Sequence, residues 1–350
     1  MSITGLSPAQ IGALSVTAIQ GLSTTVISQL AATQVAAIST AGIGALSNTQ
    51  VAALSTTQIR ALTTTQVPNF SSDVTLSSAQ LLALSANQLG VMTTTQVANF
   101  NTTAISSFAT SQIQALSAAN ISALDATQAA ALRTTQISSF NTTQVAGLSA
   151  TDIEELNSTQ ARAFTATQIA RLTTEAFAAF DTTTAASLTV TQIKALTSTQ
   201  IDAMESADLA ELAATQIAAM STTQVRAINT TNFASLTETQ VAAFSATQLQ
   251  SATNAQIAAL TDTQVAAMST TQINGLTATQ IGSLDASDLA ELTTTQIAAL
   301  SSTQVRVLNQ TGLGALSETQ VAAFGAAQIQ SLTTTTLTNL ADTLLAALTT

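Results

Sequence analysis

An eight-residue repeat runs through almost the whole chain and limits its possible folds more than any other feature. Residues 55–62, STTQIRAL, are typical: a Ser or Thr, a Gln three residues later, then Ile or Val, then Leu. The Ile/Val position recurs every eight residues, as at Ile11, Ile19, Ile27, Val35, Ile43, Val51, Ile59 and Val67. A unit this short cannot bury a core of its own, so we expect the octads to stack on one another.

Longer duplications lie on top of the octads. Residues 210–251 recur with few changes as residues 290–331, eighty positions later. We therefore predict that residues 1–350 form a single octapeptide-repeat solenoid that grew by duplication of blocks. One break in phase lies near residues 68–80, because Val67 and Leu81 are 14 positions apart, two fewer than two octads.

Each octad carries the signals that start a helix. In residues 54–59, Ser55 and Gln58 have the spacing of a capping box, in which each side chain satisfies a backbone N–H that the helix start leaves unpaired. Leu54 and Ile59 have the spacing of a hydrophobic staple across the cap. Pro8 falls at a first helical position, where proline is favoured. The sequence therefore predicts an all-α solenoid, a superhelix of very short capped helices with one helix per octad.

The alternative is a β-solenoid, because Thr, Ile and Val favour strands. Strands require alternation of apolar and polar residues, whereas the large apolar residues here are spaced three and five apart and are often followed by Ala pairs. Glycine is also scarce, with 12 residues in a chain that would turn sharply in every coil. Both observations favour the helical solenoid.

Composition excludes several classes of function. The 350 residues contain no Cys and no His, and seven basic side chains stand against 18 acidic ones. We expect no enzyme and no cofactor, because the usual acid–base and nucleophilic groups are missing. The net charge of −11 is unsuited to nucleic acid. Polar residues interrupt every apolar run, so no membrane insertion is expected, and no signal peptide is visible at the N-terminus.

An acidic octad recurs along the chain and is the one candidate metal site. Its carboxylates are Asp285, Asp288 and Glu291, with the counterparts Glu205, Asp208 and Glu211 and the partial copy Asp152, Glu154 and Glu155. Three carboxylates could bind Ca²⁺. The favoured interpretation is electrostatic: acids at a cap and in a first turn suit the positive end of a helix dipole. We therefore predict no metal site, and Asp208, Glu211, Asp288 and Glu291 are the weak candidates.

Two further features have a functional and a structural interpretation. Pro68 falls where the repeat predicts helix and should disrupt it, so residues 66–80 are either a hinge or partner site or a tolerated defect in the repeat. Runs of Thr at residues 63–65, 93–95, 293–295 and 333–336 could form a flat binding face like that of an ice-binding protein. We favour the structural interpretation of both features. Residues 66–80 are then a tolerated defect in the repeat, and Thr serves as a helix cap and a neutral polar coat.

Octads such as LTTTQIAA at residues 292–299 resemble the Thr/Ala-rich octapeptide-repeat tracts of large secreted bacterial surface and adhesin-like proteins. The resemblance implies a structural or adhesive protein, extracellular or at the cell surface, that serves as a rod, spacer or filament subunit. The alternative is a binding scaffold with ice, polysaccharide or protein on a Thr-rich face.

End-to-end self-association is also predicted. The first octads and the last ones carry apolar residues and hardly any charge, with Leu345 and Leu348 among them. All acidic side chains follow residue 72, so like charges would not oppose contact between the two kinds of end.

Overall fold

All regular secondary structure in the described part of the chain is helical. The computed structural model describes residues 3–338 and 340–348, and within them it contains no strand. Each α-helix has four to six residues, close to the length that one octad allows. The prediction of an all-α solenoid of very short helices is confirmed, and the β-solenoid alternative is wrong.

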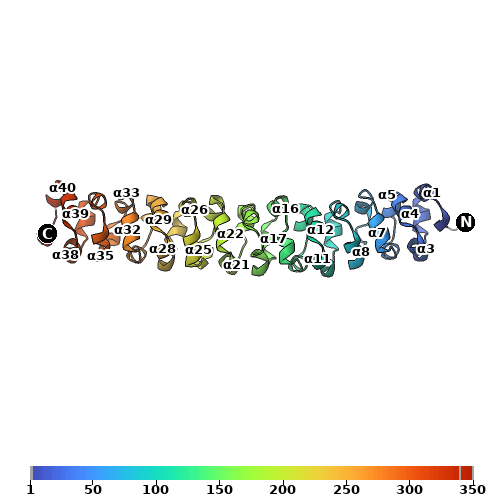
Figure 1. Ribbon diagram of the computed structural model, residues 1–350, viewed down its shortest axis with the longest axis horizontal. Helices are drawn as coiled ribbons and strands as arrows, with labels where there is room; N and C mark the ends of the chain where they lie inside the picture. Colours follow the sequence, from blue (N-terminus) through green and yellow to red (C-terminus); the bar gives the residue numbers. More distant parts are fainter. Residues whose placement is uncertain (1–2, 339, 349–350) are drawn as a thin grey trace. The chain divides into compact units, whose positions relative to one another are not determined.

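Contacts divide the chain into two compact units, Met1–Phe180 and Asp181–Thr350. Figure 1 labels helices of both units. The first unit contains the 3-10 helices η1 (Ile3–Gly5) and η2 (Val67–Asn69) and the α-helices α1 (Pro8–Gly12), α2 (Val16–Gln20), α3 (Thr24–Gln29), α4 (Ala32–Ala37), α5 (Thr40–Gly44), α6 (Asn48–Ala52), α7 (Thr56–Ala61), α8 (Ser78–Ala83), α9 (Ala86–Leu89), α10 (Thr94–Ala98), α11 (Thr102–Ser107), α12 (Thr110–Ala115), α13 (Ala118–Ser122), α14 (Ala126–Ala130), α15 (Thr134–Ile137), α16 (Thr142–Ala146), α17 (Ala150–Glu154), α18 (Ser158–Ala161), α19 (Ala166–Ile169) and α20 (Thr174–Ala178).

The second unit continues the octads without any 3-10 helix among its described residues. Its helices are α21 (Thr182–Ser187), α22 (Val190–Ala195), α23 (Ser198–Asp202), α24 (Ser206–Glu211), α25 (Ala214–Ala219), α26 (Thr222–Ala227), α27 (Thr230–Ala234), α28 (Glu238–Ala243), α29 (Ala246–Ser251), α30 (Asn254–Ile257), α31 (Asp262–Ala266), α32 (Thr270–Gly275), α33 (Ala278–Ile281), α34 (Ala286–Ala290), α35 (Thr294–Ala299), α36 (Ser302–Val305), α37 (Gln310–Gly314), α38 (Glu318–Val321), α39 (Ala326–Ser331), α40 (Thr334–Thr338) and α41 (Asp342–Ala347).

The capping box starts the helices as the sequence predicts. At α7 the Ser55 hydroxyl accepts the Gln58 backbone N–H at 3.3 Å, and the Gln58 Oε1 accepts the Ser55 backbone N–H at 2.7 Å. Ser55 itself is extended, with φ −70° and ψ 161°, as an N-cap residue should be. These two bonds satisfy N–H groups that a helix of six residues would otherwise leave exposed.

Turns such as the one between α24 and α25 are made by two consecutive extended residues. Leu212, the C-cap of α24, has φ −65° and ψ 129°, and Ala213, the N-cap of α25, has φ −64° and ψ 152°. No described residue takes a positive φ. Because L-amino acids adopt the extended region without strain, the solenoid turns at every octad without glycine, which explains why glycine is scarce.

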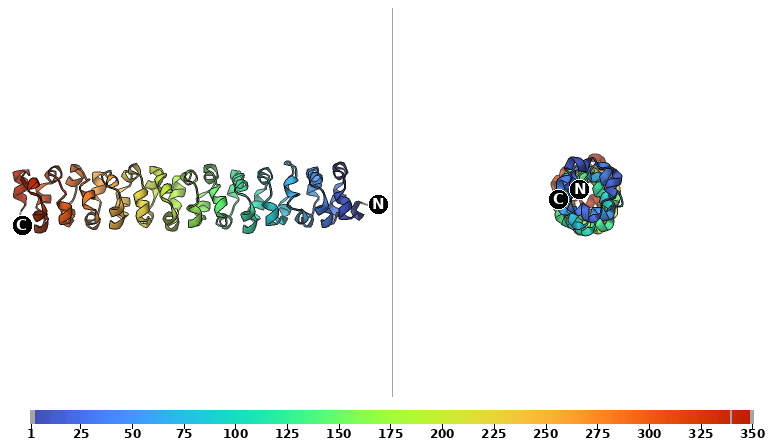
Figure 2. Two further views of the ribbon diagram at one scale, coloured as in Figure 1. Left: turned by 90° about the horizontal axis from the view of Figure 1, so that it is seen from above. Right: turned by 90° about the vertical axis from the view of Figure 1, so that its right-hand side faces the viewer.

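Successive helices of each unit wind round a common core (Figure 2). The Ile/Val position and the Leu/Phe position of each octad point into it, as with Ile59 and Leu62, which are 0% and 4% exposed. Most helices pack against the helix three octads further along, as α4 does with α7 and α26 with α29. A helix of six residues is unstable alone in water, so these contacts between coils stabilise it.

The phase break contains the longest stretch without an α-helix in the first unit. Pro68 lies in the 3-10 turn η2, and residues 71–77 form no helix before α8 begins. Val74 and Leu76 are nevertheless buried, two residues apart instead of three. The segment therefore contributes both apolar side chains of an octad to the core with six residues in place of eight.

None of the helices among the described residues is long and apolar enough to cross a membrane.

Candidate functional site

The Gln of the capping box forms a second set of hydrogen bonds that link one coil to the next. The Gln224 Nε2 donates to the carbonyl oxygens of Ile193 and Leu196 at 2.7 and 2.8 Å, while its Oε1 accepts the Ser221 N–H. Gln136 does the same with Ile105 and Phe108, at 2.7 and 3.0 Å, and is completely buried. We call this series of buried Gln side chains the glutamine ladder.

The ladder defines the size of a coil. Its acceptors lie 28 and 31 positions before the Gln, and other side chains bridge neighbouring coils over 25 to 27 positions. One coil therefore has about 28 residues, or three and a half octads. Across the phase break the separations become 26 and 29, as for Gln80 with Leu54 and Val51, because two residues are missing from the intervening chain. The ladder thus continues through the break.

Sequence reasoning identified only the local half of each Gln's role. A capping box accepts Glu as readily as Gln, yet none of the octads has Glu at this position. A carboxylate can accept the N-cap N–H but has no hydrogen to donate to carbonyls of the preceding coil. The absence of Glu is therefore the signal that could have revealed the ladder. Asn120 and Asn232 form a shorter version of the inter-coil bond. Their Nδ2 atoms donate to the carbonyl oxygens of Met92 and Met204, 28 positions earlier.

Three octads place Asp at the ladder position, and Asp288 is the most perturbed of them. Asp288 is 3% exposed, and its Oδ2 accepts the Asp285 N–H at 3.0 Å. Burial raises the pKa of Asp288 to about 6, and the neighbouring charges of Asp285 and Asp262 add to this rise, whereas the bond from the Asp285 backbone opposes it. Hydrogen bonds from the Asp288 backbone and from Ser287 lower the pKa of Asp285.

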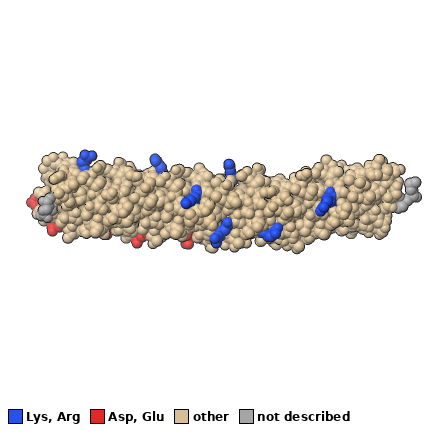
Figure 3. Space-filling model, viewed as in Figure 1, with Lys and Arg blue, Asp and Glu red and all other residues tan. Residues whose placement is uncertain are grey.

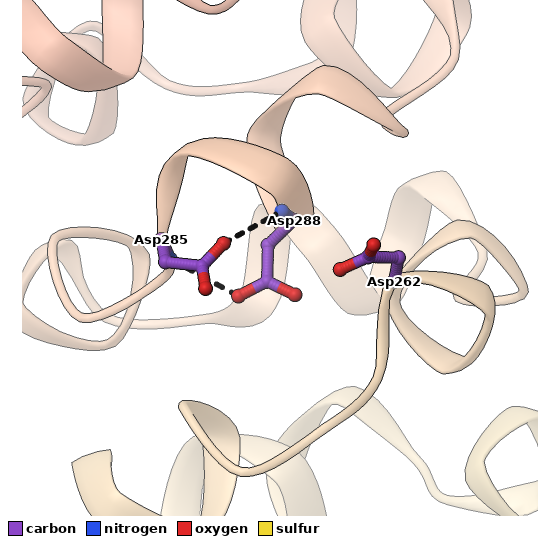
Figure 4. A group of neighbouring side chains, drawn as sticks. All are labelled: Asp262, Asp285 and Asp288. Carbon is purple, nitrogen blue, oxygen red and sulfur yellow. Dashed lines mark hydrogen bonds between the residues drawn. The ribbon is translucent and has the colours of Figure 1, made fainter.

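Asp262, Asp285 and Asp288 form an acidic cluster whose carboxylate oxygens lie within 4.8 Å of one another (Figure 4). Asp285 and Asp288 come from the start of α34, and Asp262 faces them from the start of α31 on the neighbouring coil. The sequence groups Glu291 with Asp285 and Asp288 in one octad, but the structure places Asp262 beside these two residues instead. Asp262 is 26 positions before Asp288, so its place could not be found without the length of a coil.

The other acidic octads form looser versions of this arrangement. Burial raises the pKa of Asp208 in α24, and the charge of Glu205 raises it further. The charge of Asp181, from the neighbouring coil, makes a smaller contribution in the same direction. Glu205 occupies the N-cap position of α24 but makes no capping bond. In α17, burial and the charges of Asp152 and Asp125 raise the pKa of Glu155.

The remaining weak metal candidates lie at the other ends of their helices. Glu211 ends α24, and Glu291 is the exposed C-cap of α34. Only the acidic cluster offers three carboxylates that a cation could bind at once among the described residues. Its members already serve as an N-cap, a capping-box acid and a first-turn acid, which is the electrostatic role that the sequence predicted for acids at these positions.

The segment at the phase break is tied to the coils on both sides. Thr75 N–H donates to the Asn48 Oδ1 at 3.1 Å, and the Asn99 Nδ2 donates to the Ser72 carbonyl at 2.8 Å. These bonds, together with the continuous ladder, favour the interpretation of a tolerated repeat defect over that of a hinge.

Some Thr side chains on the surface serve as helix caps. Thr293 caps α35, bonds to Thr295 at 2.9 Å and leads a run of three exposed Thr residues. In the run at 333–336, Thr336 is buried at the ladder position.

Basic side chains are scattered singly over the face shown in Figure 3. Phosphate binding requires clustered Lys and Arg, and the basic side chains on this face are spread apart.

Comparison with known families finds the ALTTAQ repeat in three segments, residues 35–72, 201–238 and 281–318. Together they cover about a third of the chain. The second and third are eighty positions apart, the distance of the block duplication. The sequence ALTTTQ at residues 61–66 has the pattern of this name, and its Gln66 belongs to the glutamine ladder. No curated protein matches the chain.

Proposed function

We propose that this protein is a structural repeat protein that acts as a rod, a spacer or a filament subunit. The observation that carries the proposal is the glutamine ladder. Within each unit it joins neighbouring coils, in most octads through a Gln side chain and equivalent backbone acceptors. Whole octads can therefore be added or removed without new kinds of contact, and the length of such a protein would scale with octad number.

Deletion of whole octads tests the proposal. Removing residues 213–268 takes out seven octads, or two coils, and joins Leu212 to Ser269 in phase. We expect the maximum dimension in small-angle scattering to shorten in proportion to the missing residues, with unchanged helix content per residue. Deletion of residues 213–216, half an octad, is the matched control and should lower the unfolding temperature because it disrupts a capping box. A protein that keeps its full length after the seven-octad deletion would contradict the spacer role.

An adhesive role and an extracellular or cell-surface location are part of the proposal and rest on the resemblance to bacterial surface-repeat tracts. Protease treatment of intact cells that make the protein tests the location. Cleavage is expected on intact cells, whereas protection until lysis would contradict it. A Thr-rich binding face for ice, polysaccharide or protein is less well supported, because Thr293 is a helix cap and Thr336 is buried.

End-to-end self-association remains part of the proposal. Leu345 is 45% exposed, which is unusual for the Ile/Val position of an octad in this chain. We expect the mass in multi-angle light scattering to rise with concentration, and Leu345→Glu to reduce the rise. A monomer at every concentration up to the millimolar range would contradict assembly and leave the spacer role intact.

We also propose that the protein is not an enzyme. The chain has no His and no Cys, and the carboxylates of the acidic cluster lie at the starts of two helices, where they serve as an N-cap, a capping-box acid and a first-turn acid.

A further inference from the structure

Among the octads of the second unit that lack the ladder Gln, the octad of α37 has no side chain at all at this position and has a cavity beside it. The ladder position of α37 is Gly312, whose N–H donates to the Asn309 Oδ1 at 2.8 Å. In the preceding and following octads Gln304 and Gln320 donate to the carbonyls of Leu276 and Leu292, at 2.8 and 2.6 Å. The corresponding acceptor for residue 312 is the Leu284 carbonyl, to which no described residue donates a hydrogen bond.

The cavity has a volume of about 280 Å³ and opens to the surface. Leu284, Asp285 and Gly312 line it together with the apolar side chains of Ile281, Leu289 and Val307. The Asp285 Oδ1 accepts from the Ser287 N–H, the Ser287 hydroxyl and the Asp288 N–H. These hydrogen bonds lower the pKa of Asp285, so the carboxylate is ionised at neutral pH. Its Oδ2 receives no hydrogen bond from a described residue.

This lining specifies the chemistry of a ligand. An unpaired carbonyl and a free carboxylate oxygen both require hydrogen-bond donors, and the carboxylate favours a positive charge. The apolar walls suit a short alkyl chain. A guanidinium gains most from two carboxylate oxygens together, whereas Asp285 has one oxygen already occupied. An ammonium group, a compact charge with three donors, fits this set of acceptors better.

We propose that this cavity binds an alkylammonium group, with the ammonium between the Leu284 carbonyl and Asp285 and its methylenes against Leu289 and Val307. This site goes beyond the structural role proposed above. The group could belong to a free alkylamine or to a lysine side chain of a partner protein, and the two share this chemistry.

The test is a titration of the full chain labelled with ¹⁵N-glycine. Its 12 glycines give a simple spectrum in which Gly282 and Gly312 report on the cavity and Gly147, in the other unit, serves as a reference. With n-pentylammonium we expect saturable shifts of the Gly282 and Gly312 signals and none at Gly147. The neutral n-pentanol should bind at least tenfold more weakly. Nα-acetyl-lysine methylamide, which imitates a lysine side chain within a protein, tests whether the group comes from a partner protein. Binding of the lysine derivative as tight as that of pentylammonium indicates a partner lysine, and binding of pentylammonium alone indicates a free amine.

Gly312→Gln is the decisive variant, because it restores the ladder side chain and fills the cavity. An added Cβ lies 2.6 Å from the Leu289 Cδ1, the end of a flexible side chain that must move. Gly314→Gln in the same helix is the matched control, since a Cβ there meets nothing within 4 Å. With Gly282 as the reporter, Gly312→Gln should lose binding and Gly314→Gln should keep it. If Gly312→Gln does not fold, Asp285→Asn should weaken binding at least tenfold. The proposal is overturned if no saturable shift occurs up to 100 mM pentylammonium, if pentanol binds equally well, or if neither Gly312→Gln nor Asp285→Asn weakens binding.

Discussion

The side-chain amide of Gln224 donates a 2.8 Å hydrogen bond to the carbonyl of Leu196, 28 positions earlier in the chain. The same side chain accepts the N–H of its own N-cap, Ser221. One buried residue thus starts a helix and attaches it to the preceding coil. The carbonyl at the end of a short helix, which has no partner within that helix, receives one from the next coil.

Replacing Gln224 should distinguish these two roles. Gln224→Val removes both and should lower the free energy of unfolding by about 2–4 kcal/mol. Gln224→Glu keeps the capping oxygen but places a carboxylate against the carbonyls of Ile193 and Leu196, so we expect a comparable loss at pH 7. At pH 4 a protonated Glu can donate, and part of the loss should be recovered. Denaturant unfolding followed by circular dichroism measures the free energy of unfolding of Gln224→Val and of Gln224→Glu at pH 7 and pH 4.

Gln250→Glu is the matched control for this pair, because Gln250 is exposed on α29 in the same unit. It should change stability little at either pH. Equal effects of Glu at positions 224 and 250 would contradict the inter-coil role of the ladder.

Asp288 should make stability depend on pH. Its pKa in the folded protein is about 6, above the ordinary 3.8, so folding favours the protonated acid. The stabilisation is complete below pH 4 and is lost as the pH rises through 6. Asp288→Asn supplies a donor toward the preceding coil, as Asn232 does for the Met204 carbonyl. At pH 7 this variant should be more stable than the native protein by on the order of 1–3 kcal/mol.

The difference in unfolding midpoint between Asp288→Asn and the native protein, measured from pH 4 to pH 7, checks this expectation. It should shrink towards pH 4 and should be reduced in an Asp262→Asn background, because Asp262 faces Asp288. A difference independent of pH would show that the ionisation of Asp288 has no effect on stability.

Calcium should stabilise the protein little, although three carboxylates meet in the acidic cluster. Asp288 is half protonated near pH 6, and Asp285 already accepts three hydrogen bonds. At pH 7 and millimolar Ca²⁺ we expect the melting temperature to shift by less than about 2 °C. A saturable rise that disappears in Asp288→Asn would identify a metal site and refute the electrostatic interpretation.

The local stability of the segment at the phase break should depend on the hydrogen bonds that Asn48 and Asn99 form with it. In the double variant Asn48→Ala/Asn99→Ala, amide hydrogen exchange across residues 71–76 should accelerate at least about tenfold, because local opening no longer breaks these bonds. Exchange in the second unit should stay unchanged. Asn87→Ala on the exposed face of α9 is the control. Unaltered exchange at 71–76 in the double variant would mean that packing of Val74 and Leu76 alone holds the segment.

Local signals in the sequence determined the helices and their register. Ser55 and Gln58 are three residues apart, so the bonds between them depend only on the backbone between them, and the capping box could be predicted without knowledge of the rest of the fold. The same holds for the buried positions of Ile59 and Leu62, because the periodicity of the octad fixes which side of a short helix is apolar. The loss of two residues at the phase break could also be predicted from the sequence, because the octad period fixes how many residues should separate Val67 from Leu81.

Only the tertiary structure decided how many octads make a coil, and everything that depends on that number. A small change in the bend between octads accumulates over a coil of about 28 residues, so no local pattern specifies which residues become neighbours. The partner of the Gln224 amide, the approach of Asp262 to Asp288 and the cavity beside Gly312 all follow from this geometry. Each joins residues more than twenty positions apart, at a distance set by how the buried side chains of successive coils pack.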